Sequence, residues 1–92
     1  MHEEAMVREL VRKVGEVAQA EGAPRVTRVR LWVGALSHLT EGGLRNRWPA
    51  ATQRTVAEGS QLELTVSTDV SDPRSTEVVL ESVDLSSTGG SP

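Results

Sequence analysis

The sequence predicts a small α+β fold in which two helices pack on one face of a three-stranded sheet, in the order α-β-α-β-β. Residues 3–21 repeat apolar side chains at the three-and-four spacing of an amphipathic helix. Residues 25–33, 61–67 and 76–85 instead alternate at period two, the spacing of strands with one buried face. A chain of 92 residues is long enough for one hydrophobic core and too short for two.

The first predicted helix, residues 3–21, is the most regular element of the sequence. Gly22 and Pro24 end it, because Gly accepts a left-handed cap conformation and Pro cannot continue the helical hydrogen bonding. We expect one side of this helix to be buried against the sheet. The apolar stripe on that side is Met6, Val7, Leu10, Val11, Val14, Val17 and Ala18.

The predicted strands each divide their side chains between a core-facing set and a wetter set. In residues 25–33, the core-facing set is Thr27, Val29, Leu31 and Val33, and the wetter set is Arg28, Arg30 and Trp32. In the later strands, Leu62, Leu64 and Val66 share one side, and Val79 lies opposite Val78 and Leu80.

A second helix is predicted after a loop at residues 34–39. Thr40 has a side chain suited to the N-cap, and a buried face is formed by Leu44, Trp48 and Ala51. Pro49 removes one internal hydrogen bond, so we expect this helix to be short or kinked.

The remaining segments connect or follow these elements. Thr68 to Ser75 is polar and contains Asp72-Pro73, a turn signature. Residues 86–92 are Ser, Thr, Gly and Pro, which have no apolar surface to bury, and we expect them to form a disordered tail. The predicted organisation is therefore one domain at residues 1–85 and a tail at residues 86–92.

The composition excludes several classes of function. A formal charge of −3 and a pI of about 5.3, with acids and bases interspersed, argue against a nucleic-acid binder. The sequence contains no Cys, so disulfides and thiolate zinc sites are not possible in it. It shows no secretory signal and no apolar run able to span a bilayer, and we expect a cytoplasmic location. No catalytic triad, phosphate-binding loop or supported pair of catalytic carboxylates is present, so we predict that the chain is not an enzyme.

The start of the chain, Met1-His2-Glu3, has the chemistry of a metal chelator. Because His2 is large, Met1 should be retained, and its α-amine, the backbone nitrogen of His2 and the His2 imidazole can close adjoining five- and six-membered rings. Three nitrogens in one plane suit Ni(II) or Cu(II) better than zinc or magnesium. Glu3 or a group from elsewhere in the chain would supply the fourth ligand.

The residues alone leave simpler interpretations open. A terminal histidine is usually only solvated, and Glu3 and Glu4 are acids of a kind common at helix starts. His38, in the loop before the second helix, is either an auxiliary ligand or a solvated loop residue. Four basic residues form either a docking face for an acidic partner or an ordinary solvated surface; they are Arg28, Arg30, Arg45 and Arg47.

Several segments, in their order and spacing, resemble the HypA family of nickel metallochaperones. The likeness runs over roughly residues 1–67 and resumes weakly in the last predicted strand. The segments are Met1-His2-Glu3, residues 25–31, residues 33–37, Leu44-Arg45 with Trp48, residues 55–60, and Leu62-Glu63. The resemblance implies that His2 is the essential Ni(II) ligand, aided by the Met1 amine and Glu3. It also implies delivery of nickel to the large subunit of a [NiFe]-hydrogenase, or to urease in some organisms, together with a HypB-type GTPase.

The chain departs from that family in one large respect. Family members insert a zinc domain with two CxxC pairs between the second and third strands, where this chain has Thr68 to Ser75 and no Cys. We therefore expect nickel binding without zinc. The alternative is a degenerate HypA-like adaptor, an interaction module that no longer transfers metal.

Overall fold

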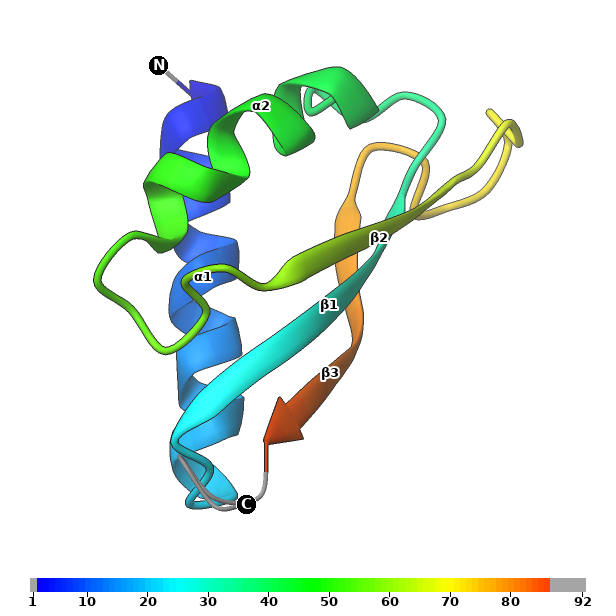
Figure 1. Ribbon diagram of the computed structural model, residues 1–92. Helices are drawn as coiled ribbons and strands as arrows, with labels where there is room; N and C mark the ends of the chain where they lie inside the picture. Colours follow the sequence, from blue (N-terminus) through cyan, green and yellow to red (C-terminus); the bar gives the residue numbers. More distant parts are fainter. Residues whose placement is uncertain (1, 87–92) are drawn as a thin grey trace.

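Two helices and three strands form two layers in the computed structural model, which describes residues 2–86 and, for His2, the backbone only (Figure 1). The elements follow the predicted order α-β-α-β-β. They are α1 (His2–Ala20), β1 (Arg25–Val33), α2 (Glu41–Thr52), β2 (Gln61–Val66) and β3 (Val78–Ser86). Both helices pack on the same face of the sheet, as predicted, with α1 contacting β1 and β3 and α2 contacting β2.

The sheet has the strand order β2-β1-β3, so the central strand β1 pairs with both of the others. β1 is parallel to β2 and antiparallel to β3. A parallel pair needs a long connection between its strands, and α2 lies within this one. The remaining connection, from β2 to β3, returns to the far side of β1.

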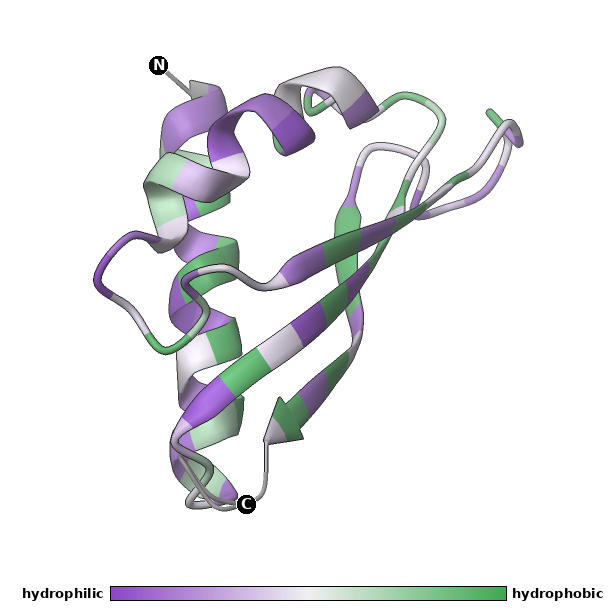
Figure 2. Cartoon of the chain, in the orientation of Figure 1, coloured by the Kyte–Doolittle hydropathy of each residue, from purple (hydrophilic) through white to green (hydrophobic). Residues whose placement is uncertain are grey.

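The hydrophobic core lies between the helices and the sheet. Figure 2 shows the hydrophobic side of α1 turned toward the strands. Val7, Val14 and Leu31 are among the most buried side chains. Val17 is 37 % exposed, so its predicted burial was wrong. It lies at the margin of the apolar stripe, beyond the part of the helix surface that the sheet covers. No helix among the described residues is long and apolar enough to cross a membrane.

The predicted alternation is wrong at the start of β1, because a β-bulge changes which side chains face the core. Val26 pairs with Leu85 and Arg28 with Asp84, so Thr27 is an extra residue in β1. Val26 is consequently buried at 2 % exposure, whereas Thr27, predicted to face the core, is exposed. The Thr27 hydroxyl donates a hydrogen bond to the Asp84 carbonyl oxygen at 3.2 Å.

A second irregularity lies in β3. Arg30 pairs with Ser82 and Leu31 with Leu80, which leaves Glu81 as the extra residue. The core-facing residues of β3 on the two sides of this bulge are Val78, Leu80, Val83 and Leu85. Ser86 is the last residue of β3 and pairs with Arg25, so the predicted tail begins one residue too early. The rest of that tail, residues 87–92, lies outside the described residues.

α2 has the predicted N-cap. The Gly43 N–H donates to Thr40 Oγ1 at 3.0 Å, and Leu44 and Trp48 are buried. Pro49 does not end the helix, which continues to Thr52. The fully buried Thr52 hydroxyl donates to the Trp48 carbonyl oxygen at 2.8 Å and joins the buried face, where Ala51 is only partly buried.

The segment between β2 and β3 folds back on the end of β1. The Leu36 N–H donates to the Ser75 carbonyl oxygen at 2.7 Å, and the Gly34 N–H donates to the Glu77 carbonyl oxygen at 2.8 Å. A Cβ at Gly34 would lie 2.3 Å from the Ser75 carbonyl oxygen, so only glycine permits this close approach. The contact fixes the start of the loop that leads to α2.

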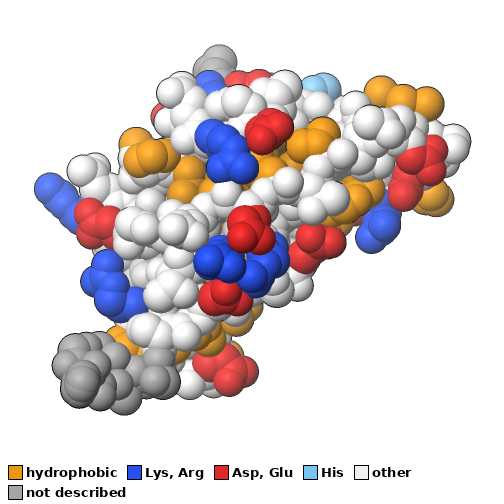
Figure 3. All heavy atoms as spheres, turned by 45° about the vertical axis from the view of Figure 1, so that its right-hand side comes forward, with side chains coloured by type: hydrophobic (Ala, Val, Ile, Leu, Met, Phe, Trp, Pro, Cys, Tyr) orange, Lys and Arg blue, Asp and Glu red, His pale blue; other side chains and the backbone are white. Residues whose placement is uncertain are grey.

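The face of the sheet without helices is polar. Figure 3 shows basic side chains flanked by acidic ones on the surface of the molecule. Arg30 contacts Asp84 at 2.8 Å and Glu63 at 3.0 Å, and Arg28 lies 3.4 Å from Glu63. The hydrogen bond from Arg30 holds the pKa of the Asp84 carboxyl below its usual value. This arrangement confirms the prediction that Arg28 and Arg30 lie on the face of β1 that is turned away from the core.

Candidate metal-binding site

The predicted ligands lie at the amino end of α1. The helix begins at His2, and Glu3 and Glu4 occupy its first turn. Met1 and the side chain of His2 lie outside the described residues. The buried residues Val7 and Leu10 follow within two turns, so the hydrophobic core holds the helix close to its first residues.

Glu3 is joined to the second helix. Its carboxylate Oε1 lies 3.1 Å from Nη2 of Arg47, and both side chains are partly exposed, at 41 % for Glu3 and 35 % for Arg47. The ion pair connects the first turn of α1 to the middle of α2. Sequence reasoning missed this partner of Glu3, because the two residues are far apart in the chain and no local pattern links them.

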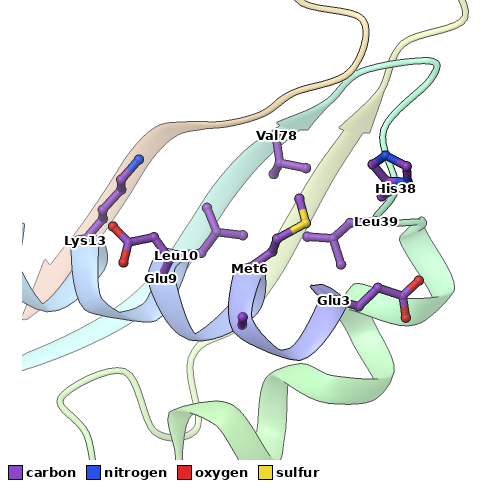
Figure 4. A pocket seen from close by; sticks show the side chains of 9 residues that line it. Glu3, Met6, Glu9, Leu10, Lys13, His38, Leu39 and Val78 are labelled. Atoms are coloured by element: carbon purple, nitrogen blue, oxygen red, sulfur yellow. The ribbon is translucent and has the colours of Figure 1, made fainter. Parts of the chain in front are cut away.

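Beside the first turns of α1 lies an open groove of about 870 Å³. Its larger apolar residues are Met6 and Leu10 of α1, Leu39 of the loop before α2 and Val78 of β3 (Figure 4). Its polar and charged residues are Glu3, Glu9, Lys13 and His38. The groove therefore combines an apolar surface with acidic and basic groups.

His38 lies at the same end of this groove as Glu3 (Figure 4). The next residue, Leu39, is 1 % exposed and anchors the loop, and its N–H donates to Ser37 Oγ at 3.1 Å. This anchoring leaves His38 exposed. The fold thus places Glu3 and His38 on the same groove, although they are far apart in the sequence.

The groups in this region do not make a complete metal site by themselves. Within residues 2–86, apart from the His2 side chain, no cluster of three or more His, Asp or Glu side chains is placed to hold a metal ion.

The basic residues considered as a docking face are paired with acids. Arg47 pairs with Glu3, and Arg45 pairs with Glu41 at 3.3 Å. Arg45 also donates to the Leu62 carbonyl oxygen at 2.8 Å, which links α2 to the edge strand β2. Together with the paired Arg28 and Arg30, these contacts favour the interpretation of an ordinary charged surface, with both signs interspersed.

A family model and several individual proteins of the same kind are similar to this chain. The family model described as "Hydrogenase/urease nickel incorporation, metallochaperone, hypA" matches residues 1–72. The hydrogenase maturation factor HypA of Chlorobium limicola is 39 % identical over 64 residues, which are 70 % of this chain and 55 % of that protein. The HypA proteins of Rhizobium leguminosarum and Thermococcus kodakarensis are 39 % and 38 % identical over 64 and 63 residues, covering 57 % and 45 % of their lengths. The chain thus spans about half the length of these relatives.

The fold is also similar to a solved structure. The solution structure of the Ni metallochaperone HypA from Helicobacter pylori matches with a TM-score of 0.78, covering 90 % of this chain and 96 % of that chain. The sequence identity is 15 %, so this likeness shows the fold.

Proposed function

The chain belongs to the HypA family, whose model describes nickel incorporation for hydrogenase and urease, and we propose that it binds Ni(II) at its first residues and delivers it to a hydrogenase precursor. The Met1 amine, the backbone nitrogen of His2 and the His2 imidazole are the proposed nitrogen ligands. Glu3 supplies the fourth ligand. The observation that carries the proposal is the family match, which begins at residue 1 and includes this triplet.

The position of the triplet supports this chemistry. Because α1 begins at His2, its first turn projects from a helix whose later turns are anchored in the core. The positive end of a helix dipole disfavours a cation, but the carboxylates of Glu3 and Glu4 in the first turn offset that field. The first turn therefore tolerates a divalent ion bound by the triplet.

The proposed site is sensitive to pH. The backbone amide must lose its proton and the imidazole must be neutral before three nitrogens can bind the metal. Nickel affinity should therefore fall as the pH is lowered through the histidine range.

The proposed recipients and partners follow from the family. They are the large subunit of a [NiFe]-hydrogenase, or a urease in its place, and a HypB-type GTPase. With no Cys in the sequence, thiolate zinc ligation is not available, and we propose that the chain carries nickel without zinc and without catalysing a reaction.

Calorimetric titration of the untagged protein with Ni(II) tests the proposal. We expect one ion bound per chain in the micromolar range or tighter, and loss of that binding in His2→Ala. His38→Ala removes the other histidine of the sequence and shows whether that side chain takes part in binding. Absence of binding, or equal binding in His2→Ala and the wild type, would falsify the nickel site.

A second candidate function is an adaptor of HypA-like fold that no longer transfers metal. It is favoured by the absence of Cys from the sequence, which leaves no thiolate ligands for the zinc domain of the family. A hydrogenase maturation assay in a strain lacking its own HypA separates the two candidates. Rescue by this chain that is lost with His2→Ala excludes the adaptor, whereas nickel binding without rescue favours it.

A further inference from the structure

The ion pair between Glu3 and Arg47 involves a proposed nickel ligand. Among residues 2–86, it is the one ion pair that joins two helices, with 3.1 Å between Glu3 Oε1 and Arg47 Nη2. The other ion pairs of the helices lie within α1, around Arg12, or within α2, between Arg45 and Glu41. The carboxylate proposed for nickel is therefore already bound by a cation.

A divalent metal ion at the proposed site would compete with Arg47 for this carboxylate. A guanidinium beside a bound Ni(II) would be repelled by it, because both are cations in a partly exposed environment of modest screening. Resting on the proposed function, we propose that Glu3 exchanges partners. It binds Arg47 in the metal-free protein and Ni(II) in the loaded protein, so that nickel releases the ion pair between α1 and α2.

The surroundings of Arg47 offer the released side chain another position. A hollow between the two helices is lined by Arg47 and Asn46 of α2 and by Glu4 and Arg8 of α1. Glu4, the residue after Glu3, is exposed and gives Arg47 a second acid within this hollow. Arg47 therefore passes from Glu3 to Glu4 when nickel binds.

The exchange does not require the helices to separate. Residues of both α1 and α2, among them Val7, Leu44 and Trp48, belong to the same buried core. Near Arg47, a Cβ added at Gly43 would lie 3.6 Å from Arg47 Nη1, so the guanidinium lies alongside a glycine that leaves it space. The exchange needs movement of the Glu3 and Arg47 side chains and not of the helices.

The effect of Arg47 on nickel affinity tests the exchange. Competition titration against a chromophoric chelator should show Ni(II) bound about two- to fivefold more tightly by Arg47→Gln than by the wild type, the range that corresponds to an exposed ion pair. Arg45→Gln is the matched control, since it removes the same charge from the same helix without touching Glu3. Its affinity should equal that of the wild type.

A double variant shows whether Arg47 acts through Glu3. In a Glu3→Gln background, Arg47→Gln should no longer change nickel affinity. Weaker or unchanged binding in Arg47→Gln, or a gain that persists without the Glu3 carboxylate, would overturn the exchange.

Two further measurements separate this inference from the proposed function. In metal-free protein, the Glu3→Gln and Arg47→Gln variants should be coupled in a double-mutant cycle of unfolding free energy, which needs no nickel. In the wild type, one equivalent of Ni(II) should shift the Nε–Hε resonance of Arg47, and Glu4→Gln should change the position to which it moves.

If the wild type binds no nickel, the proposed function and the exchange both fail. If it binds nickel but the resonance does not move or the cycle shows no coupling, the exchange alone fails.

Discussion

The first turn of α1 and the turns that follow it differ in what they contact. In the later turns, Val7, Val11, Val14 and Ala18 are buried against the sheet and α2. In the first turn, Glu4 is exposed, and Glu3 makes an ion pair that is itself partly exposed. The later turns of α1 hold the helix in the hydrophobic core, whereas the side chains of Glu3 and Glu4 in its first turn stay at least partly exposed. Stability and metal binding should therefore respond to different substitutions along it.

The largest expected effect concerns the amine of Met1. Acetylation of the N-terminus, or a short N-terminal extension, removes the free amine from the proposed chelate. Loss of a direct ligand should weaken Ni(II) binding at least about a hundredfold, the upper range for loss of groups that merely support a ligand. Calorimetry measures the affinity, and thermal unfolding should show an unchanged fold. Retained binding after acetylation would remove the amine from the site.

Val14→Ala should produce the converse result. Val14 is 0 % exposed, and the loss of two buried methyl groups should lower the free energy of unfolding by about 2 kcal/mol. Urea unfolding measures this loss, and Glu4→Gln in the first turn is the control, with a change of about 0.5 kcal/mol or less. The folded Val14→Ala protein should bind nickel as the wild type does. A weakened affinity would show that the two parts of α1 are not separable.

The cap of α2 should have an intermediate effect. Thr40→Ala leaves the Gly43 N–H without its side-chain acceptor and should lower the free energy of unfolding by about 1 kcal/mol. Because α2 carries Arg47, this variant also tests whether the first turn of α1 depends on a firmly capped α2. Thr40→Ser keeps the hydroxyl and should restore most of the stability; an equal loss in both variants would assign the effect to packing of the threonine methyl.

The smallest effect is expected on the open face of the sheet. Arg30 lowers the pKa of Asp84, so the ionised carboxylate stabilises the folded state above the unfolded pKa of about 4. This stabilisation is lost as the pH falls through the lower, folded pKa. The difference in unfolding free energy between wild type and Asp84→Asn should therefore shrink when urea unfolding is repeated below about pH 4. The exposed pair should contribute little at any pH, and it provides a reference for the Glu3–Arg47 pair. A difference that grew with acidity would contradict the lowered pKa.

The elements of the fold were predictable because their signals are local. The bounds of β1 agree with the predicted range, and Thr40 caps α2 as its side chain indicated. The faces of strands were less predictable. Thr27 is exposed because of a bulge against Asp84, a residue 57 positions away, and period-two alternation within one strand cannot indicate a change of register with another.

The candidate site shows the same division. The chelate proposed for Met1, His2 and Glu3 stays a prediction, and it could be made from the sequence because its rings involve covalent neighbours. The relation of Glu3 to Arg47 and to His38 was not readable. Both depend on how α2 and its preceding loop pack against α1.

The order of the elements, the proposed nitrogen and oxygen donors of residues 1–3 and the lack of thiolates all follow from the sequence alone. These properties depend on composition and on spacing over a few residues. The contact of the Glu3 carboxylate with a guanidinium of α2, and the position of His38 on the same groove, became visible in the folded chain. The physical reason is that contacts between distant segments are set by packing of the shared core, which places α1 and α2 against one sheet.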